Sequence, residues 1–268
     1  MNILIPVLTM MALGFLFSAG LVFAYKKLKV EEDPRVEKVT EMLPQANCGA
    51  CGYSGCRAFA EAVVQGKASP ASCPVGGEEG AQEIAAALGI QTGEIIKKVA
   101  RVHCRGTKEA AKDKGPYWGI PTCEAAHLLG GQKLCFYGCL GFGDCVKACP
   151  FDAIYMEKDG LPRVDDEKCT ACGKCVDACP RNILELHPLN QNIFVFCRSL
   201  DRGPTARKVC KNSCIACGIC SRACPEAIPI EDNLAKILNY KNIIPEKTPE
   251  IEKCPTQAIG RLYKNNEG

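Results

Sequence analysis

The chain begins with an uninterrupted apolar run and then turns polar at once. Residues 3–24 carry no charged side chain, and Tyr25 and three lysines within residues 26–29 follow directly. A helix needs about 20 apolar residues to cross a bilayer, and Lys or Arg on one flank marks the cytoplasmic side. The run predicts a single-pass anchor over residues 1–25 in the cell inner (cytoplasmic) membrane, with the bulk of the chain on the cytoplasmic side. A cleaved signal peptide is the alternative, although the positively charged N-terminal region of such peptides is missing.

Behind this run the apolar positions come in short groups. Val36, Val39 and Leu43 repeat with helical spacing, which predicts a short helix or a polar linker over residues 31–42. Further helices are expected over residues 58–64 and 78–88, the second ending at Gly89. Residues 94–102 favour a strand, with a helix as the alternative.

The composition narrows the ways in which such short elements can be held together. Of the 268 residues, 47% are hydrophobic, which excludes a disordered chain, but only 6% are aromatic, too few for one large conventional core. The 21 cysteines suggest disulfides, zinc or iron–sulfur clusters instead. Cytosolic thiols stay reduced, so the predicted location disfavours disulfides. A formal charge of +3 gives no reason to expect a nucleic-acid partner.

The cysteines fall into blocks, and the blocks repeat. At an offset of 75 residues, five cysteines in the middle of the chain fall on five others near its end. The pattern indicates an internal duplication of a unit that is itself duplicated. The matched sets are Cys135, Cys139, Cys145, Cys149 and Cys179, and Cys210, Cys214, Cys220, Cys224 and Cys254.

Two segments, residues 169–180 and 214–225, carry the spacing C-x2-C-x2-C-x3-C-P. This is the bacterial ferredoxin motif for [4Fe–4S] clusters, in which the fourth cysteine binds the sister cluster. Each iron of the cube needs one soft thiolate. Zinc sites use two cysteine pairs rather than a triplet followed by Cys-Pro. The motif therefore favours iron–sulfur clusters.

The chain here resembles the two-cluster ferredoxins, and the crossover rule of that family assigns ligands. One cluster is expected on Cys149, Cys169, Cys172 and Cys175. The sister motif has Phe142 in place of its middle cysteine. Cys135 is the available substitute, so the second cluster is expected on Cys135, Cys139, Cys145 and Cys179.

The second unit is degenerate. Positions 244, 247 and 250, where a second triplet is expected, hold Ile244, Lys247 and Glu250. We therefore expect one cluster in this unit rather than two. Its expected ligands are Cys214, Cys217, Cys220 and Cys254, with Cys210 or Cys224 as alternatives.

A separate cysteine group lies upstream of both units, in a glycine-rich loop. Its four thiolates suit one more [4Fe–4S] cluster, with structural zinc as the alternative. The expected ligands are Cys48, Cys51, Cys56 and Cys73. This brings the expected total to four [4Fe–4S] clusters. Five cysteines remain, for which a buried thiol is the ordinary interpretation and a further cluster the alternative: Cys104, Cys123, Cys197, Cys210 and Cys224.

The order of these elements resembles the B subunit of the Rnf complex, the ion-translocating ferredoxin:NAD⁺ oxidoreductase. The resemblance rests on the anchor, the Asn47-Cys-Gly-x-Cys-Gly-x-x-Gly-Cys56 loop and the segment Tyr137-Gly-Cys-Leu-Gly-Phe-Gly-Asp-Cys145. It implies an electron-transfer subunit of a translocase, with reduced ferredoxin, the membrane and NAD-binding subunits and the membrane itself as partners. Alternatives are a polyferredoxin-type electron-feeding subunit of another membrane redox enzyme, or an iron–sulfur redox sensor.

The residues agree with a carrier that has no catalytic residues of its own. No G-x-G-x-x-G or P-loop motif occurs, so no flavin or NAD site is expected on this chain. His103, His127 and His187 are scattered and are interpreted as packing or surface residues. Several basic residues lie near ligand positions, and some are hypothesised to form a docking face for an acidic ferredoxin. They are Lys147, Lys168, Lys174, Arg181, Lys208, Lys211 and Arg222.

The expected fold class is α+β, built from an anchor and three cluster-binding parts. The expected boundaries are residues 1–25 for the transmembrane anchor, 26–92 for the single-cluster domain, 93–130 for a connecting segment, 131–188 for the two-cluster ferredoxin-like domain and 189–268 for the degenerate ferredoxin-like domain.

Overall fold

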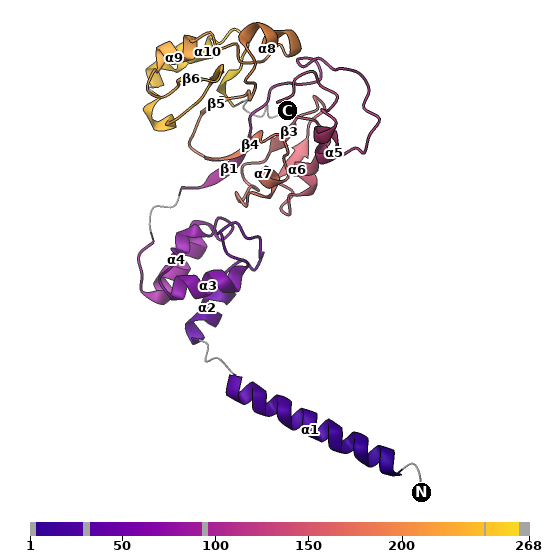
Figure 1. Ribbon diagram of the computed structural model, residues 1–268. Coiled ribbons are helices and arrows are strands. Elements are labelled where there is room, and N and C mark those ends of the chain that lie inside the picture. Colours follow the sequence, from indigo (N-terminus) through magenta and orange to yellow (C-terminus); the bar gives the residue numbers. More distant parts are fainter. Residues whose placement is uncertain (1–3, 29–32, 93–95, 244, 263–268) are drawn as a thin grey trace.

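The computed structural model describes residues 4–28, 33–92, 96–243 and 245–262. Its first element is the long helix α1, Leu4–Leu28, which stands apart from the remaining elements in Figure 1. The segment Leu4–Lys27 has a mean hydropathy of 2.2, and none of it is buried against the rest of the chain. Its Thr9 and Ser18 hydroxyls donate to carbonyls of the preceding turn at 2.9 and 2.7 Å. The helix therefore satisfies its own polar groups, as a membrane span must.

A small helical domain follows the anchor. The expected helix within residues 31–42 is confirmed over Pro34–Met42, and residues 31 and 32 lie outside the described residues. Val39, Phe59 and Ile84, one from each main helix, are almost fully buried and form the core. The last helix ends at Gly89, whose φ of 67° is the left-handed cap predicted from sequence. The elements are α2 (Pro34–Met42), α3 (Cys56–Val64), η1 (Pro70–Ser72) and α4 (Gly77–Leu88).

The next unit has two small antiparallel sheets. Strand β1, Lys98–Val102, pairs with β4, Leu184–Pro188, so that Lys98 faces Pro188 and Val102 faces Leu184. The strand expected over residues 94–102 is thus confirmed from residue 98, while residues 93–95 lie outside the described residues. Because β1 pairs with β4, the segment expected as a connector, residues 93–130, supplies an outer strand to this unit. The remaining elements are α5 (Cys123–Leu128), α6 (Asp144–Lys147), β2 (Ile154–Met156), β3 (Pro162–Val164) and α7 (Lys174–Asp177).

The last unit repeats this arrangement. Strand β5, Ile193–Val195, pairs with β8, Ile259–Arg261, as β1 pairs with β4, and an inner β6–β7 hairpin takes the place of β2–β3. Strand β8 begins 75 residues after β4, the same offset that relates the cysteines. The other elements are α8 (Gly203–Val209), α9 (Ile219–Ala223), β6 (Ile230–Glu231), β7 (Leu234–Ala235), η2 (Tyr240–Asn242), η3 (Pro245–Lys247) and α10 (Thr248–Glu252).

The loop after β1 joins the two units. It forms a β-bridge between Ala111 and Cys210, and it exchanges backbone hydrogen bonds with the end of α8. These run from the Lys112 N–H to the Val209 carbonyl at 2.9 Å and from the Lys211 N–H to the Ala110 carbonyl at 2.8 Å. Figure 1 shows the two units side by side, with this loop at their junction.

Candidate iron–sulfur sites

The first ferredoxin-like unit brings one predicted set of cysteines together. Cys175 is buried, and its neighbours Cys169, Cys172 and Cys149 all contribute to its electrostatic surroundings. Burial, and then these nearby thiolates, raise the pKa of Cys175 to about 12. Backbone N–H groups of Ala100 and Ala153 lie 3.4 Å from the sulfurs of Cys169 and Cys149. Such thiols stay neutral by themselves and ionise when a metal replaces their protons.

The sister site of this unit differs from the expected set. Its cavity is lined by Cys139, Cys145 and Cys179, as expected, and by Cys123. Cys135 does not line it and faces a different cavity instead. The Asp144 carboxylate accepts a 2.7 Å hydrogen bond from the Cys123 N–H, and this holds the start of α5 against the cysteine loop.

Cys123 could not be found from spacing alone. It lies 16 residues upstream of Cys139, outside the ferredoxin motif. The missing ligand position is taken by Phe142, whose ring packs 5.3 Å from that of Tyr117 in the loop leading to α5. The loop that carries Tyr117 leads directly to Cys123, which lines the cavity.

The last unit places its predicted set around one cavity. Burial, and then the neighbouring thiolates, raise the pKa of Cys220 to about 11. Cys224 does not line this cavity and packs in an apolar cluster with Ile228, Ile251 and the partly buried Ile243. Cys224 is thus a buried thiol of the apolar core, which agrees with the loss of the second triplet. The cavity-lining cysteines are Cys214, Cys217, Cys220 and Cys254.

The small helical domain gathers the predicted N-terminal cysteines around its loop. The Asn47 side chain accepts a 2.9 Å hydrogen bond from the Cys56 N–H and ties the two ends of the loop together. Burial raises the pKa of Cys73, and the thiolates of Cys51 and Cys56 add to this effect. The Gly76 N–H lies 3.3 Å from the Cys73 sulfur. Cys48, next to Asn47, completes the loop set.

The spacing of the sulfurs argues against zinc. A tetrahedral zinc site with Zn–S bonds of about 2.3 Å places its sulfurs about 3.8 Å apart. In the described part of the chain, no three cysteine sulfurs lie within 4.8 Å of one another. The cysteine groups surround wider spaces, which fit a four-iron cube better than a single ion.

Among the described residues, His103, Glu185 and His187 bring their ligand atoms within 4.8 Å of one another. Here the two imidazoles share a 2.8 Å Nε2–Nε2 hydrogen bond, and Glu185 forms an ion pair with Arg198. Burial lowers the pKa of His103 to about 4, so the ring is neutral at pH 7. These contacts make the group a hydrogen-bonded packing cluster.

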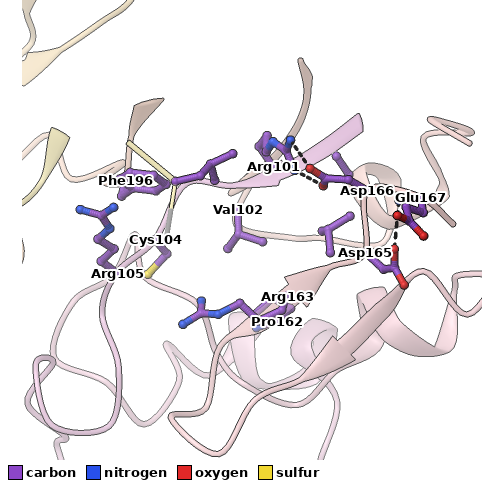
Figure 2. Close-up of a pocket in the computed structure, with 13 residues that line it drawn as sticks. Arg101, Val102, Cys104, Arg105, Pro162, Arg163, Asp165, Asp166, Glu167 and Phe196 are labelled. Carbon is purple, nitrogen blue, oxygen red and sulfur yellow. Dashed lines mark hydrogen bonds and ion pairs between the residues drawn. The ribbon is translucent and has the colours of Figure 1, made fainter. Parts of the chain in front are cut away.

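An open pocket lies over β1 and β3, with Cys104 in its wall (Figure 2). Arg105 stacks on Phe196, 3.7 Å from the ring centroid, and Arg101 forms a two-pronged ion pair with Asp166. Figure 2 shows the Arg105 and Arg163 side chains at the same end as Cys104, with the three acidic residues 165–167 at the other end. Arg163 is held in an ion pair with Asp159 at 2.7 Å.

Three family models match the cysteine-rich regions. The model for an Fe-S cluster domain matches residues 43–75, and two models for a 4Fe-4S dicluster domain match residues 137–186 and 168–229. The first match covers the N-terminal set, and the other two cover most of the first ferredoxin-like unit and the last unit as far as residue 229. The matches support iron–sulfur clusters in all three parts.

Curated relatives resemble the chain over most of its length. It is 47% identical over 96% of its length, and over 77% of the relative, to the B subunit of the Na⁺-translocating ferredoxin:NAD⁺ oxidoreductase complex of Acetobacterium woodii. It is 41% identical over 100% of its length, and over 95% of the relative, to the B subunit of the proton-translocating complex of Clostridium ljungdahlii. The B subunit of the ion-translocating oxidoreductase complex of Methanosarcina acetivorans is 42% identical over 74% of this chain and 76% of its own.

Proposed function

Because the chain belongs to the family of B subunits of ion-translocating ferredoxin:NAD⁺ oxidoreductase complexes, we propose that it carries electrons from reduced ferredoxin to the other subunits of such a complex. It is an iron–sulfur electron-transfer subunit of a redox enzyme. The observation that carries the proposal is the grouping of its cysteines around separate, mostly buried sites. No residue of this chain is assigned a catalytic role toward NAD⁺.

We assign four sites of the [4Fe–4S] type, three of which keep the sets expected from sequence. The exception is the sister site of the first ferredoxin-like unit, where Cys123 takes the position expected for Cys135. The sets are Cys48, Cys51, Cys56 and Cys73; Cys149, Cys169, Cys172 and Cys175; Cys123, Cys139, Cys145 and Cys179; and Cys214, Cys217, Cys220 and Cys254.

The chain's own residues would adjust the reduction potentials of these sites in two ways. When bound, each cluster supplies a one-electron redox couple whose potential depends on burial and on hydrogen bonds to sulfur. Buried aliphatic residues such as Ile154 and Leu184 keep water away from the first unit's ligands. Backbone N–H groups, such as that of Ala100 toward Cys169, stabilise the added negative charge of a reduced site.

Membrane attachment follows from α1. Its length and its fully exposed apolar surface support a single span, and Lys26 and Lys27 in its last turn support a cytoplasmic location for the domains that follow. With this orientation the cysteine sites would lie on the side where soluble ferredoxin is available.

Lys168 and Lys174 are candidates for the ferredoxin docking face. Lys168 is exposed and directly precedes Cys169, and Lys174 starts α7 between Cys172 and Cys175. Basic groups this close to a buried site would steer an acidic carrier to it.

The test is anaerobic purification of the full chain in detergent, followed by iron analysis and mixing with reduced ferredoxin. We expect the visible iron–sulfur absorption of the chain to bleach as ferredoxin is reoxidised. A chain that contains clusters but is not reduced by ferredoxin would overturn the proposed electron donor. A chain without clusters would overturn the carrier role itself.

A further inference from the structure

A cavity between the two ferredoxin-like units is lined by four cysteines that the assigned sets leave unused. We propose that it is a fifth [4Fe–4S] site. Like the sister site in the first unit, it is a hollow lined by four cysteines. All four cysteines are buried, with 7–9% of their surface exposed. They are Cys104, Cys135, Cys197 and Cys210.

The sulfurs converge although the residues are far apart in sequence. A Cβ atom placed on Gly106 would lie 3.4 Å from the Cys104 sulfur and 3.7 Å from the Cys210 sulfur, so these two sulfurs flank one glycine. Cys104 and Cys135 both act electrostatically on Cys210, and Cys104 acts on Cys197. The absence of a Cβ at position 106 leaves this part of the cavity open.

The internal duplication relates the four residues in two equivalent pairs. Cys104 follows the last residue of β1 by two positions, as Cys197 follows the last residue of β5. Cys135 and Cys210 are related by the 75-residue offset. Each unit thus contributes the same two positions, and the site lies where the two halves of the duplication meet.

Each of these sulfurs receives a backbone N–H hydrogen bond from the residue two positions further on. Gly106 and Ser199 donate to Cys104 and Cys197 at 3.3 and 3.4 Å. Tyr137 and Asn212 do the same for Cys135 and Cys210. Cys73 and Cys254 in the assigned sets receive bonds from Val75 and Thr256 in the same way. Hydrogen bonds of this kind stabilise metal-bound thiolates.

A buried cation also points to negative charge in this cavity. Lys133 lines the cavity, is only 5% exposed, and donates to the Gly106 carbonyl at 2.6 Å. Among the described residues, no carboxylate forms an ion pair with it. A buried ammonium needs a nearby negative charge. Four thiolates around an iron–sulfur core supply that charge.

The site would connect the two units. The Cys139 N–H donates to the Cys104 sulfur at 3.4 Å, and the Cys214 N–H donates to the Cys197 sulfur. Cys139 and Cys214 are themselves duplicated positions, and each belongs to the assigned set of its own unit. A cluster here would therefore lie one hydrogen bond away from a ligand of both neighbouring sites, which suits one-electron transfer between them.

This inference rests on the proposed function. The experiment is therefore chosen so that the failure of the fifth site and the failure of the carrier role give different iron counts. The full chain, reconstituted anaerobically with iron and sulfide, should contain about 20 iron atoms if five [4Fe–4S] sites are filled, and about 16 if four are filled. The double variant Cys197→Ala and Cys210→Ala should lose about one fifth of the iron and of the integrated spin signal of the reduced protein. Cys224→Ala, at a buried cysteine outside every set, is the matched control and should lose neither.

A count of about 16 iron atoms in the wild-type chain overturns the fifth site, as does a double variant with undiminished iron. A wild-type chain with almost no iron overturns the proposed function as well. The wild-type count does not depend on the variant's folding. For the variant, far-ultraviolet circular dichroism and the signals of the other sites show whether the loss is confined to one site.

Discussion

The backbone N–H of Cys139 lies 3.4 Å from the sulfur of Cys104, although 35 residues separate them. Cys139 belongs to a ferredoxin motif, whereas Cys104 follows the outer strand β1. The contact shows that the segment between them returns the chain to the cysteine loop.

Replacing Cys123 tests the altered ligand set of the first unit. Cys123→Ala should remove the sister cluster, with a loss of about four iron atoms, because its thiol completes that cavity. Iron and sulfide analysis of the reconstituted chain measures this. If the iron content stays unchanged, the set expected from sequence, with Cys135, is the correct one.

Lys133→Gln tests the buried charge. Removing a positive charge beside a site that becomes more negative on reduction should lower its midpoint potential, by about 60 mV for a tenfold change in the one-electron equilibrium. A redox titration followed by electron paramagnetic resonance measures the shift. Lys112→Gln, on an exposed side chain of the loop after β1, is the control and should leave all potentials unchanged. Equal shifts in both variants would contradict a local effect.

Charge reversal at Lys168 and Lys174 should slow association with reduced ferredoxin several-fold at low salt. The effect should fade as salt screens the charges. Stopped-flow bleaching of the chain's absorption gives the rate. The double reversal Lys38→Glu and Lys67→Glu, at two exposed lysines of the separate helical domain, carries the same charge change and should leave the rate unchanged. An unchanged rate in the double reversal at Lys168 and Lys174 would show that these two lysines do not steer ferredoxin.

Removal of residues 1–28 should release the chain from membranes without loss of iron, because α1 makes no buried contact with the cluster-binding domains. Membrane fractionation and iron analysis test both parts. For the full chain in inside-out vesicles, protease should digest the domains after α1. Protection in such vesicles would reverse the proposed orientation.

Phe59→Ala should destabilise the small helical domain by about 3–5 kcal/mol, the usual cost of deleting a large buried ring. Phe59 is 1% exposed and packs against Tyr53 in the cysteine loop. Loss of the N-terminal cluster should follow, while the ferredoxin-like units keep theirs. Denaturant titration with iron analysis measures this, and Phe136→Ala, at a half-exposed ring, is the control.

Local spacing accounts for the parts of the fold that could be predicted. The cap at Gly89, the helix over Pro34–Met42 and the strand ending at Val102 each depend on neighbouring residues, and all three are found. The cysteines of the triplet that starts at Cys169 are also close together because only two residues separate each from the next.

The sequence by itself determined the membrane-type helix, the duplicated ferredoxin motifs and the iron–sulfur chemistry, because these depend on composition and on spacings of two to four residues. Only the tertiary structure placed Cys123 at the sister site and separated Cys135 from it. It also brought Cys104 and Cys135 from one unit to Cys197 and Cys210 from the other. Such convergence depends on strand pairing and on the packing of two duplicated units, and no local spacing encodes it.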